Sequence, residues 1–228
     1  MCLEINNALS KEKIFEIMGN YYGNAHYRDA QRLSWSVHDL VLISRILDTV
    51  NSLGYKFSNL SRLSDYEDIR FASIVFDNYG RFENQELNEE LISSLCFKSY
   101  HPYTPKLLDL YRSENNNQLK YRLSNSLFLI RNKKYIPDYI SIVTDDDYGK
   151  NVDMIIDILC KYRVPIALHI LIELYKKYPA EWTFKFLQLG KLYQDPIVIP
   201  YLQILSTHDN IEYRTMAQKA LQIYIRND

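Results

Sequence analysis

Glycine and cysteine are both scarce in this sequence. Only 6 of 228 residues are glycine, and neither the glycine-rich loop that cradles phosphate nor the dinucleotide-binding fingerprint is present. The three cysteines, Cys2, Cys96 and Cys160, are odd in number and far apart, which fits neither a disulfide framework nor a zinc site. The five histidines show no pair at metal-ligand spacing. We therefore expect no metal, no other cofactor and a reducing, cytoplasmic environment.

Long apolar runs and an excess of charge of one sign are also absent. No segment approaches the roughly 18 apolar residues of a membrane span. The amino terminus, MCLEINNALSKEKIFE, places charges where a signal peptide needs an apolar stretch. With 27 Lys plus Arg against 28 Asp plus Glu, no overall field draws the protein to nucleic acid or an anionic membrane. We expect no membrane partner, and nucleic acid only through a local patch.

Apolar residues recur at helical spacing along most of the chain. The clearest stripe runs from Tyr213 to Ile225, and Asp209 with Glu212 is a plausible capping pair for that helix. Similar stripes cover Val152 to Cys160 and Ile69 to Phe76, with Gly80 placed where the second helix ends. The pattern predicts an all-α protein of about twelve helices. They are expected near 11–18, 36–53, 69–80, 86–97, 105–112, 118–130, 136–143, 151–160, 165–178, 181–193, 197–206 and 213–225.

The spacing of four prolines indicates a repeat. Pro105, Pro137, Pro165 and Pro200 each fall at or near the start of the first helix of a predicted pair. Proline is accepted in the first turn of a helix and penalised inside it. An interval close to thirty residues, with two helices in each unit, is typical of a stacked repeat.

The last unit, DPIVIPYLQILSTHDNIEYRTMAQKALQIYI, resembles a HEAT repeat. The residues that match the pattern of that family are Pro200, Leu202, Leu205, Asp209, Tyr213, Arg214, Ala217, Ala220 and Leu221. The resemblance implies a right-handed α-solenoid of roughly five to six antiparallel helix pairs, a single domain over 1–228. Residues 101–228 would form the clearer repeats and 1–100 divergent or capping helices. It also implies that Arg70, Arg122 and Arg214 stabilise the stacking by pairing with a turn Asp.

An acidic run is the most concentrated charge feature. Asp145, Asp146 and Asp147 are followed by Asp153 and Asp157, four residues apart on one predicted helix. The run has two interpretations, a solvated turn whose aspartates cap a helix or an acidic patch for a basic protein partner. In a solenoid the second helices line the concave surface. The predicted partner-binding residues are therefore Tyr121, Asp146, Asp147, Tyr148, Asp153 and Asp157.

Twenty tyrosines are unusual for this length. An AT-rich genome accounts for such an excess, and so does a binding surface, where tyrosine supplies rigid amphipathic area. Composition alone leaves both explanations open.

No catalytic arrangement is visible, so the sequence favours a protein-binding role over catalysis. As a small HEAT-like sequence with a local acidic cluster, the chain resembles cytoplasmic immunity proteins. These bind and neutralise a toxin domain, often a basic nuclease. One alternative is a HEAT-like DNA glycosylase, with Trp35 or Trp182 in a cleft and Asp109, Asp138 or Asp157 as the carboxylate. Another alternative is an adaptor or scaffold protein.

Overall fold

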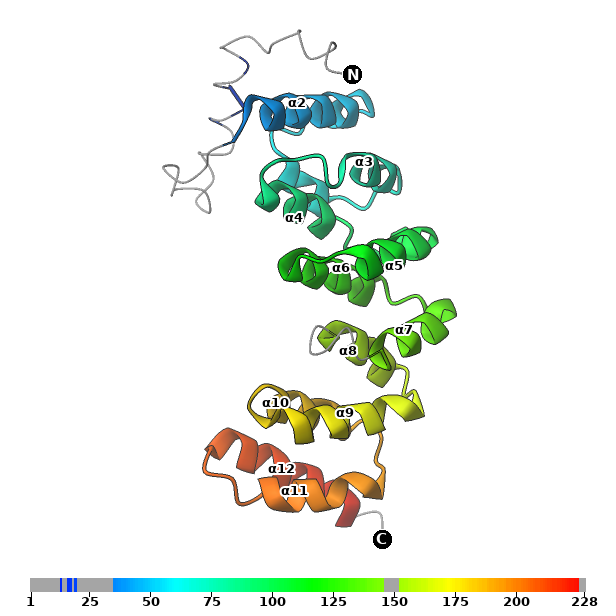
Figure 1. The fold of residues 1–228 in the computed structure, drawn as a ribbon, viewed down its shortest axis with the longest axis vertical. Coiled ribbons are helices and arrows are strands. Elements are labelled where there is room, and N and C mark those ends of the chain that lie inside the picture. Colours follow the sequence, from blue (N-terminus) through cyan, green and yellow to red (C-terminus); the bar gives the residue numbers. More distant parts are fainter. Residues whose placement is uncertain (1–12, 14–15, 18, 20–34, 146–151, 226–228) are drawn as a thin grey trace. The chain divides into compact units, whose positions relative to one another are not determined.

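The computed structural model describes residues 13, 16, 17, 19, 35–145 and 152–225 (Figure 1). All regular structure within these residues is helical, and no strand occurs among them. The contacts within the chain divide it into two compact units, unit 1 at residues 1–130 and unit 2 at residues 131–228. The all-α prediction is therefore confirmed. The prediction that 1–228 form one continuous solenoid domain stays a prediction, and the two units are described separately.

The described part of unit 1 consists of helices of unequal length, with 3-10 segments between α2 and α3 and between α4 and α5. Its elements are α2 (Val37–Ser52), η3 (Leu60–Asp65), α3 (Arg70–Asn78), α4 (Gln85–Ser93), η4 (Lys98–Tyr103), α5 (Thr104–Ser113) and α6 (Asn117–Ile130). Helix α2 packs on α3, α4 packs on η3 and α6, and α5 packs on α6. The sequence did not predict η3, which the buried side chains of Leu60 and Leu63 hold against the core.

Local sequence explains where the first helices of unit 1 begin and end. Helix α2 starts at a capping box, in which the Ser36 hydroxyl accepts from the Asp39 N–H and the Asp39 carboxylate accepts from the Ser36 N–H. After α3 the chain turns at Gly80, whose φ of +76° lies in the left-handed region that glycine adopts without strain. The Gly80 N–H donates to the buried side chain of Asn88 in α4.

Unit 2 consists of helices packed in adjacent pairs. Its elements are η5 (Lys133–Tyr135), α7 (Ile136–Val143), α8 (Asp153–Lys161), α9 (Pro165–Lys177), α10 (Pro179–Gly190), η7 (Pro196–Val198), α11 (Ile199–Leu205) and α12 (Ile211–Ile225). Helix α7 packs on α8, α9 on α10, and α11 on α12. Successive pairs meet through α7 with α9, α8 with α9, and α10 with α12. None of the described helices has both the length and the apolar character needed to cross a bilayer.

The proline prediction is confirmed. Pro105, Pro137, Pro165 and Pro200 each lie in the first two positions of α5, α7, α9 and α11, the first helices of their pairs. In unit 2 a non-glycine residue with positive φ precedes each pair. These left-handed residues are Arg131 (φ 47°), Arg163 (φ 53°) and Gln194 (φ 51°).

The predicted capping pair of the last helix is wrong by one residue. The side-chain oxygen of Asn210, rather than Asp209, accepts from the backbone N–H groups of Glu212 and Tyr213, at 2.9 and 3.3 Å. Asparagine and aspartate are nearly equivalent in this role, so residue type alone could not choose between neighbours.

The three arginines of the HEAT pattern have different partners. Arg70 binds the carboxylate of Asp68 through two nitrogens, as predicted. The same prediction is wrong for the other two. Arg122 of α6 pairs with Glu89 of α4, and Arg214 donates to the backbone carbonyl of His208 in the preceding turn. Arg122 therefore joins two packed helices, whereas Arg214 stabilises its own turn.

Candidate functional site

Of the predicted partner-binding aspartates, the structure describes Asp153 and Asp157, both in unit 2. Asp146, Asp147 and Tyr148 lie outside the described residues. Asp153 begins α8 and Asp157 lies one turn further along. The Asp157 carboxylate accepts from the Lys185 ammonium of α10 at 3.0 Å, and each of these two side chains is only 18% exposed. Lys185 also donates to the backbone carbonyl of Asp153.

The ion pair makes Asp157 part of the packing between α8 and α10. Burial raises the pKa of the neighbouring Asp153 carboxyl, with Lys185 lowering it and Asp157 raising it. The ammonium of Lys185 lies 5.8 Å from the centre of the Trp182 ring, and Trp182 itself is 1% exposed. Trp182 is thus a packing residue rather than an exposed ring on which a base could stack, while Trp35, the other tryptophan of the glycosylase hypothesis, is partly exposed.

Tyr121, the remaining predicted residue, lies in unit 1 on α6 and is 45% exposed. It directly precedes Arg122, which lines an open hollow of about 480 Å³. The hollow is bounded by η3, α4 and α6, and we call it the α4 hollow. Its lining residues are Ser61, Ser64, Glu86, Glu89, Glu90, Ser93 and Arg122.

The α4 hollow carries a net negative charge because three of its residues are glutamates and one is arginine. Glu86, Glu89 and Glu90 are three and four positions apart on α4, a spacing that places their side chains on one face of a helix. Glu86 is exposed, while Glu89 and Glu90 are partly buried. The hollow therefore suits positively charged groups that enter from solvent.

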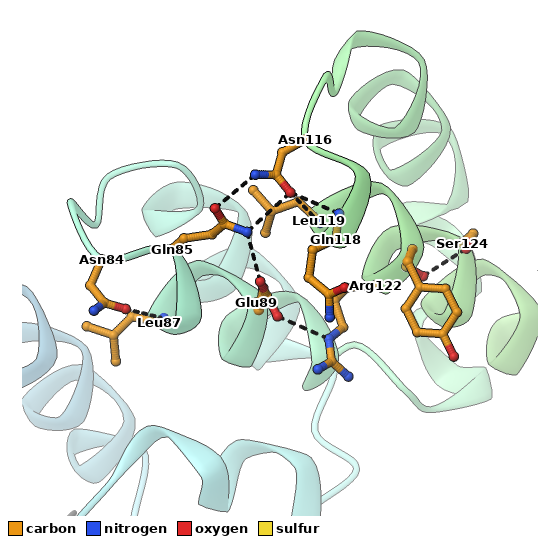
Figure 2. Close-up of polar contacts among 10 residues, drawn as sticks. Asn84, Gln85, Leu87, Glu89, Asn116, Gln118, Leu119, Arg122 and Ser124 are labelled. Carbon is orange, nitrogen blue, oxygen red and sulfur yellow. Dashed lines mark hydrogen bonds and ion pairs between the residues drawn. The ribbon is translucent and has the colours of Figure 1, made fainter. Parts of the chain in front are cut away.

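Both oxygens of the Glu89 carboxylate are held in place (Figure 2). One accepts from the Gln85 amide at 3.0 Å, and the other accepts from Nε of Arg122 at 3.4 Å. Gln85 in turn forms a reciprocal amide pair with Asn116, with distances of 2.8 and 3.2 Å. The side-chain oxygen of Asn116 also accepts from the N–H groups of Gln118 and Leu119, so it caps α6.

The same polar chain extends to the end of α3. The Glu114 carboxylate accepts from the Asn116 N–H at 2.8 Å and from the Tyr79 hydroxyl at 2.6 Å. Burial raises the pKa of Tyr79, and the hydrogen bond to Glu114 raises it further, so the phenol remains a donor. The chain of contacts from Tyr79 to Arg122 fixes the turn before α6 against α4 and gives the hollow a preformed wall.

Sequence reasoning missed the glutamates of this site. The segment ENQELNEE at 83–90 holds four glutamates, two of them in the pair Glu89–Glu90, and was visible in the sequence. Attention to helical spacing would have found it, because i, i+3 and i+4 define one helix face. The aspartate run is the more conspicuous pattern because three of its acidic residues are consecutive, whereas the glutamates of α4 are separated by other residues.

The hollow offers charge and shape rather than an obvious reaction centre. Among the described residues, no group of three His, Cys, Asp or Glu side chains has a geometry that could hold a metal ion. Comparison with protein-family models and with curated proteins gave no match to this sequence.

Proposed function

We propose that this protein binds another protein through the α4 hollow, and that the partner presents a basic segment. The supporting observation is the convergence of Glu86, Glu89 and Glu90 in one open hollow whose geometry is fixed by hydrogen bonds. A prearranged site loses less conformational entropy on binding than a flexible one. Its negative charge would accelerate association with a basic partner and discriminate against acidic ones.

Tyr121 supplies the apolar component of the proposed interface. It is an exposed aromatic residue adjacent in sequence to Arg122 of the hollow, and aromatic residues carry much of the binding energy in protein interfaces. The nearly neutral whole chain does not oppose this proposal, because the relevant charge is local to α4.

More specifically, we propose that the protein is a HEAT-like immunity protein. The adjacent helix pairs support a HEAT-like repeat architecture, and an acidic docking site fits an immunity protein that neutralises a basic toxin or nuclease domain. Such an inhibitor requires a complementary surface and no chemistry of its own. An adaptor that binds several partners more weakly would use the same surface and is distinguished by experiment.

The experiment compares two charge reversals of equal size. Glu86→Lys places a cation in the rim of the hollow. Asp109→Lys makes the same change of charge on α5, outside the hollow, where the Asp109 carboxylate is 79% exposed. A tagged protein would be used to recover partners from its native cell, and the affinity of each purified partner would be measured for both variants. We expect Glu86→Lys to weaken binding by about tenfold or more, with a slower association rate.

Two further measurements make the test decisive. Tyr121→Ala should weaken the same complex by about fivefold or more. For an inhibitor, co-expression should suppress the activity of the partner, and Glu86→Lys should restore it. Equal affinities of the Glu86→Lys and Asp109→Lys variants, or a partner without a basic segment, would refute the proposed interface.

A further inference from the structure

Three tyrosines in unit 2 are separated by the same interval. Tyr162 follows α8, Tyr193 follows α10 and Tyr224 lies near the end of α12, at intervals of 31 residues. Each therefore stands at the end of the second helix of a pair. The left-handed residues Arg131, Arg163 and Gln194 stand at the start of those same pairs.

Two of these tyrosines connect the beginning and the end of their own helix pair. The Tyr162 hydroxyl donates to the backbone carbonyl of Arg131 at 2.5 Å, and the Tyr193 hydroxyl donates to that of Val164 at 3.0 Å. The first bond spans 31 residues and the second spans 29. An antiparallel helix pair is joined by a covalent turn at one end only, so each hydrogen bond closes the opposite end. We call this bond a hairpin staple.

The chemistry of the staple suits its position. The acceptors are the carbonyl of Arg131, which is itself left-handed, and that of Val164, which follows the left-handed Arg163 and also accepts from the Ala167 N–H at 3.0 Å. Each staple therefore adds a bond where the chain enters the pair. Burial and the neighbouring Cys160 raise the pKa of Tyr193, so its phenol keeps the proton that it donates. A phenylalanine at this position would pack in the same way without making the bond.

The third tyrosine has no such bond. The Tyr224 oxygen is buried and, among the described residues, has no hydrogen-bond partner. At the start of its pair, the Asp195 side chain accepts from the backbone N–H of Ile197 at 3.0 Å and thereby caps η7. The pair formed by α11 and α12 thus has a tyrosine at the equivalent position but lacks the closing bond.

We infer that the hairpin staples set the order in which unit 2 opens, and that the unstapled α11–α12 pair opens before the α7–α8 and α9–α10 pairs. Local opening in proteins is governed by such differences in local stabilisation. The consequence is a conformational device, a terminal helix pair that separates while its neighbours stay closed.

Hydrogen exchange of the full chain tests this inference. Amides at the start of α11 should exchange faster than those at the start of α9 in the unaltered protein. Tyr193→Phe should accelerate exchange at the start of α9 by about fivefold, the effect of losing one net hydrogen bond. Tyr162→Phe should do the same at the start of α7, while Tyr224→Phe should not accelerate exchange in α11, because it removes a buried hydroxyl that has no hydrogen-bond partner among the described residues.

Tyr213→Phe provides the matched control. Its ring contacts His208, and phenylalanine preserves that contact while removing a hydroxyl that makes no staple. An effect of Tyr224→Phe as large as that of Tyr193→Phe would overturn the inference, because the third pair would then be stapled as well. So would a Tyr193→Phe variant that exchanges like the Tyr213→Phe control.

Discussion

Helix pairs in unit 2 follow one another at nearly constant intervals, whereas the helices of unit 1 do not. In unit 2 the left-handed residues Arg131, Arg163 and Gln194 mark the starts of successive pairs. Among the described residues of unit 1 the positive-φ residues are Gly54 and Gly80, and no such regular series marks the starts of its helix pairs. Regular spacing lets one hydrogen bond be reused in successive pairs, as in the two hairpin staples.

The irregular unit contains the more elaborate polar network. The chain of contacts from Tyr79 to Arg122 contains hydrogen bonds between residues up to 35 positions apart, and two of its members, Glu89 and Arg122, line the α4 hollow. Repetition favours stability through equivalent interfaces, while departure from it allows a unique set of side chains to converge. The proposed binding surface thus lies in the less regular of the two units.

The largest expected contrast is between two ion pairs, one joining two helices within unit 2 and the other joining two helices within unit 1. In unit 2, Lys185→Met should lower the free energy of unfolding by about 2–3 kcal/mol, because it leaves the Asp157 carboxylate partly buried without its cation. In unit 1, Arg122→Met should cost less than about 1 kcal/mol, because Arg122 is 38% exposed and water screens the pair. Denaturant titration of both variants gives the two values, and equal losses would contradict this ranking.

The helix caps provide a second contrast. Asn116 and Asn210 each accept from the second and third N–H groups beyond them, in α6 and α12. Asn210→Ala should cost about 1 kcal/mol, the usual value of an N-cap. Asn116→Ala should cost about 2 kcal/mol, because the amide pair with Gln85 is lost as well. Thermal unfolding of both variants checks the difference. In a Gln85→Ala background, the additional cost of Asn116→Ala over Asn210→Ala should largely disappear.

Acid should weaken a contact specific to unit 1. The hydrogen bonds from Arg70 lower the pKa of Asp68 from 3.8 to about 2, while burial opposes the shift and Tyr55 reinforces it. Because the folded pKa is depressed, the stabilisation is complete above about pH 4 and is lost as the pH falls towards 2. We expect a loss of about 1 kcal/mol, kept small by the exposure of Arg70. Unfolding of Asp68→Asn at both pH values should show a flatter dependence than the unaltered protein.

The smallest expected effects have opposite signs in the two units. Arg163 adopts a φ of 53°, so Arg163→Gly should stabilise the fold by up to about 1 kcal/mol. Gly80 adopts a φ of +76° with no neighbouring atom within 4 Å of an added Cβ, so Gly80→Ala should destabilise it by about 1 kcal/mol through backbone strain alone. Midpoints of thermal unfolding distinguish the two signs.

Much of the fold could be predicted because its signals are local. Helix α7 has the predicted bounds, and α2 begins after Ser36, where a serine precedes an apolar stripe and Asp39 completes the box. The proline positions likewise depend only on backbone geometry within one turn. In contrast, η3 has no distinctive sequence pattern and is maintained by the burial of Leu60 and Leu63 in the tertiary structure.

The site was less predictable because it depends on contacts between distant residues. Tyr121 could be chosen from helical spacing, and it is exposed on α6, one residue before Arg122 of the α4 hollow. The pairing of Asp157 with Lys185 joins residues 28 positions apart, and no local pattern marks it. The same holds for the amide pair of Gln85 and Asn116, which are 31 positions apart. Besides an AT-rich genome and a binding surface, a structural role accounts for two of the tyrosines, because Tyr162 and Tyr193 close helix pairs.

The equivalence of Arg163 and Gln194 as starting points defines a modular block, residues 163–193. Arg163, which opens the block, and Gln194, which opens the next pair, both have positive φ, and the closing bond lies wholly inside the block. A duplicated copy inserted in frame would be preceded and followed by the same left-handed turn, and repeat arrays change in length by such whole units. Unit 2 therefore offers a route by which a lineage of such proteins could lengthen while leaving the α4 hollow untouched.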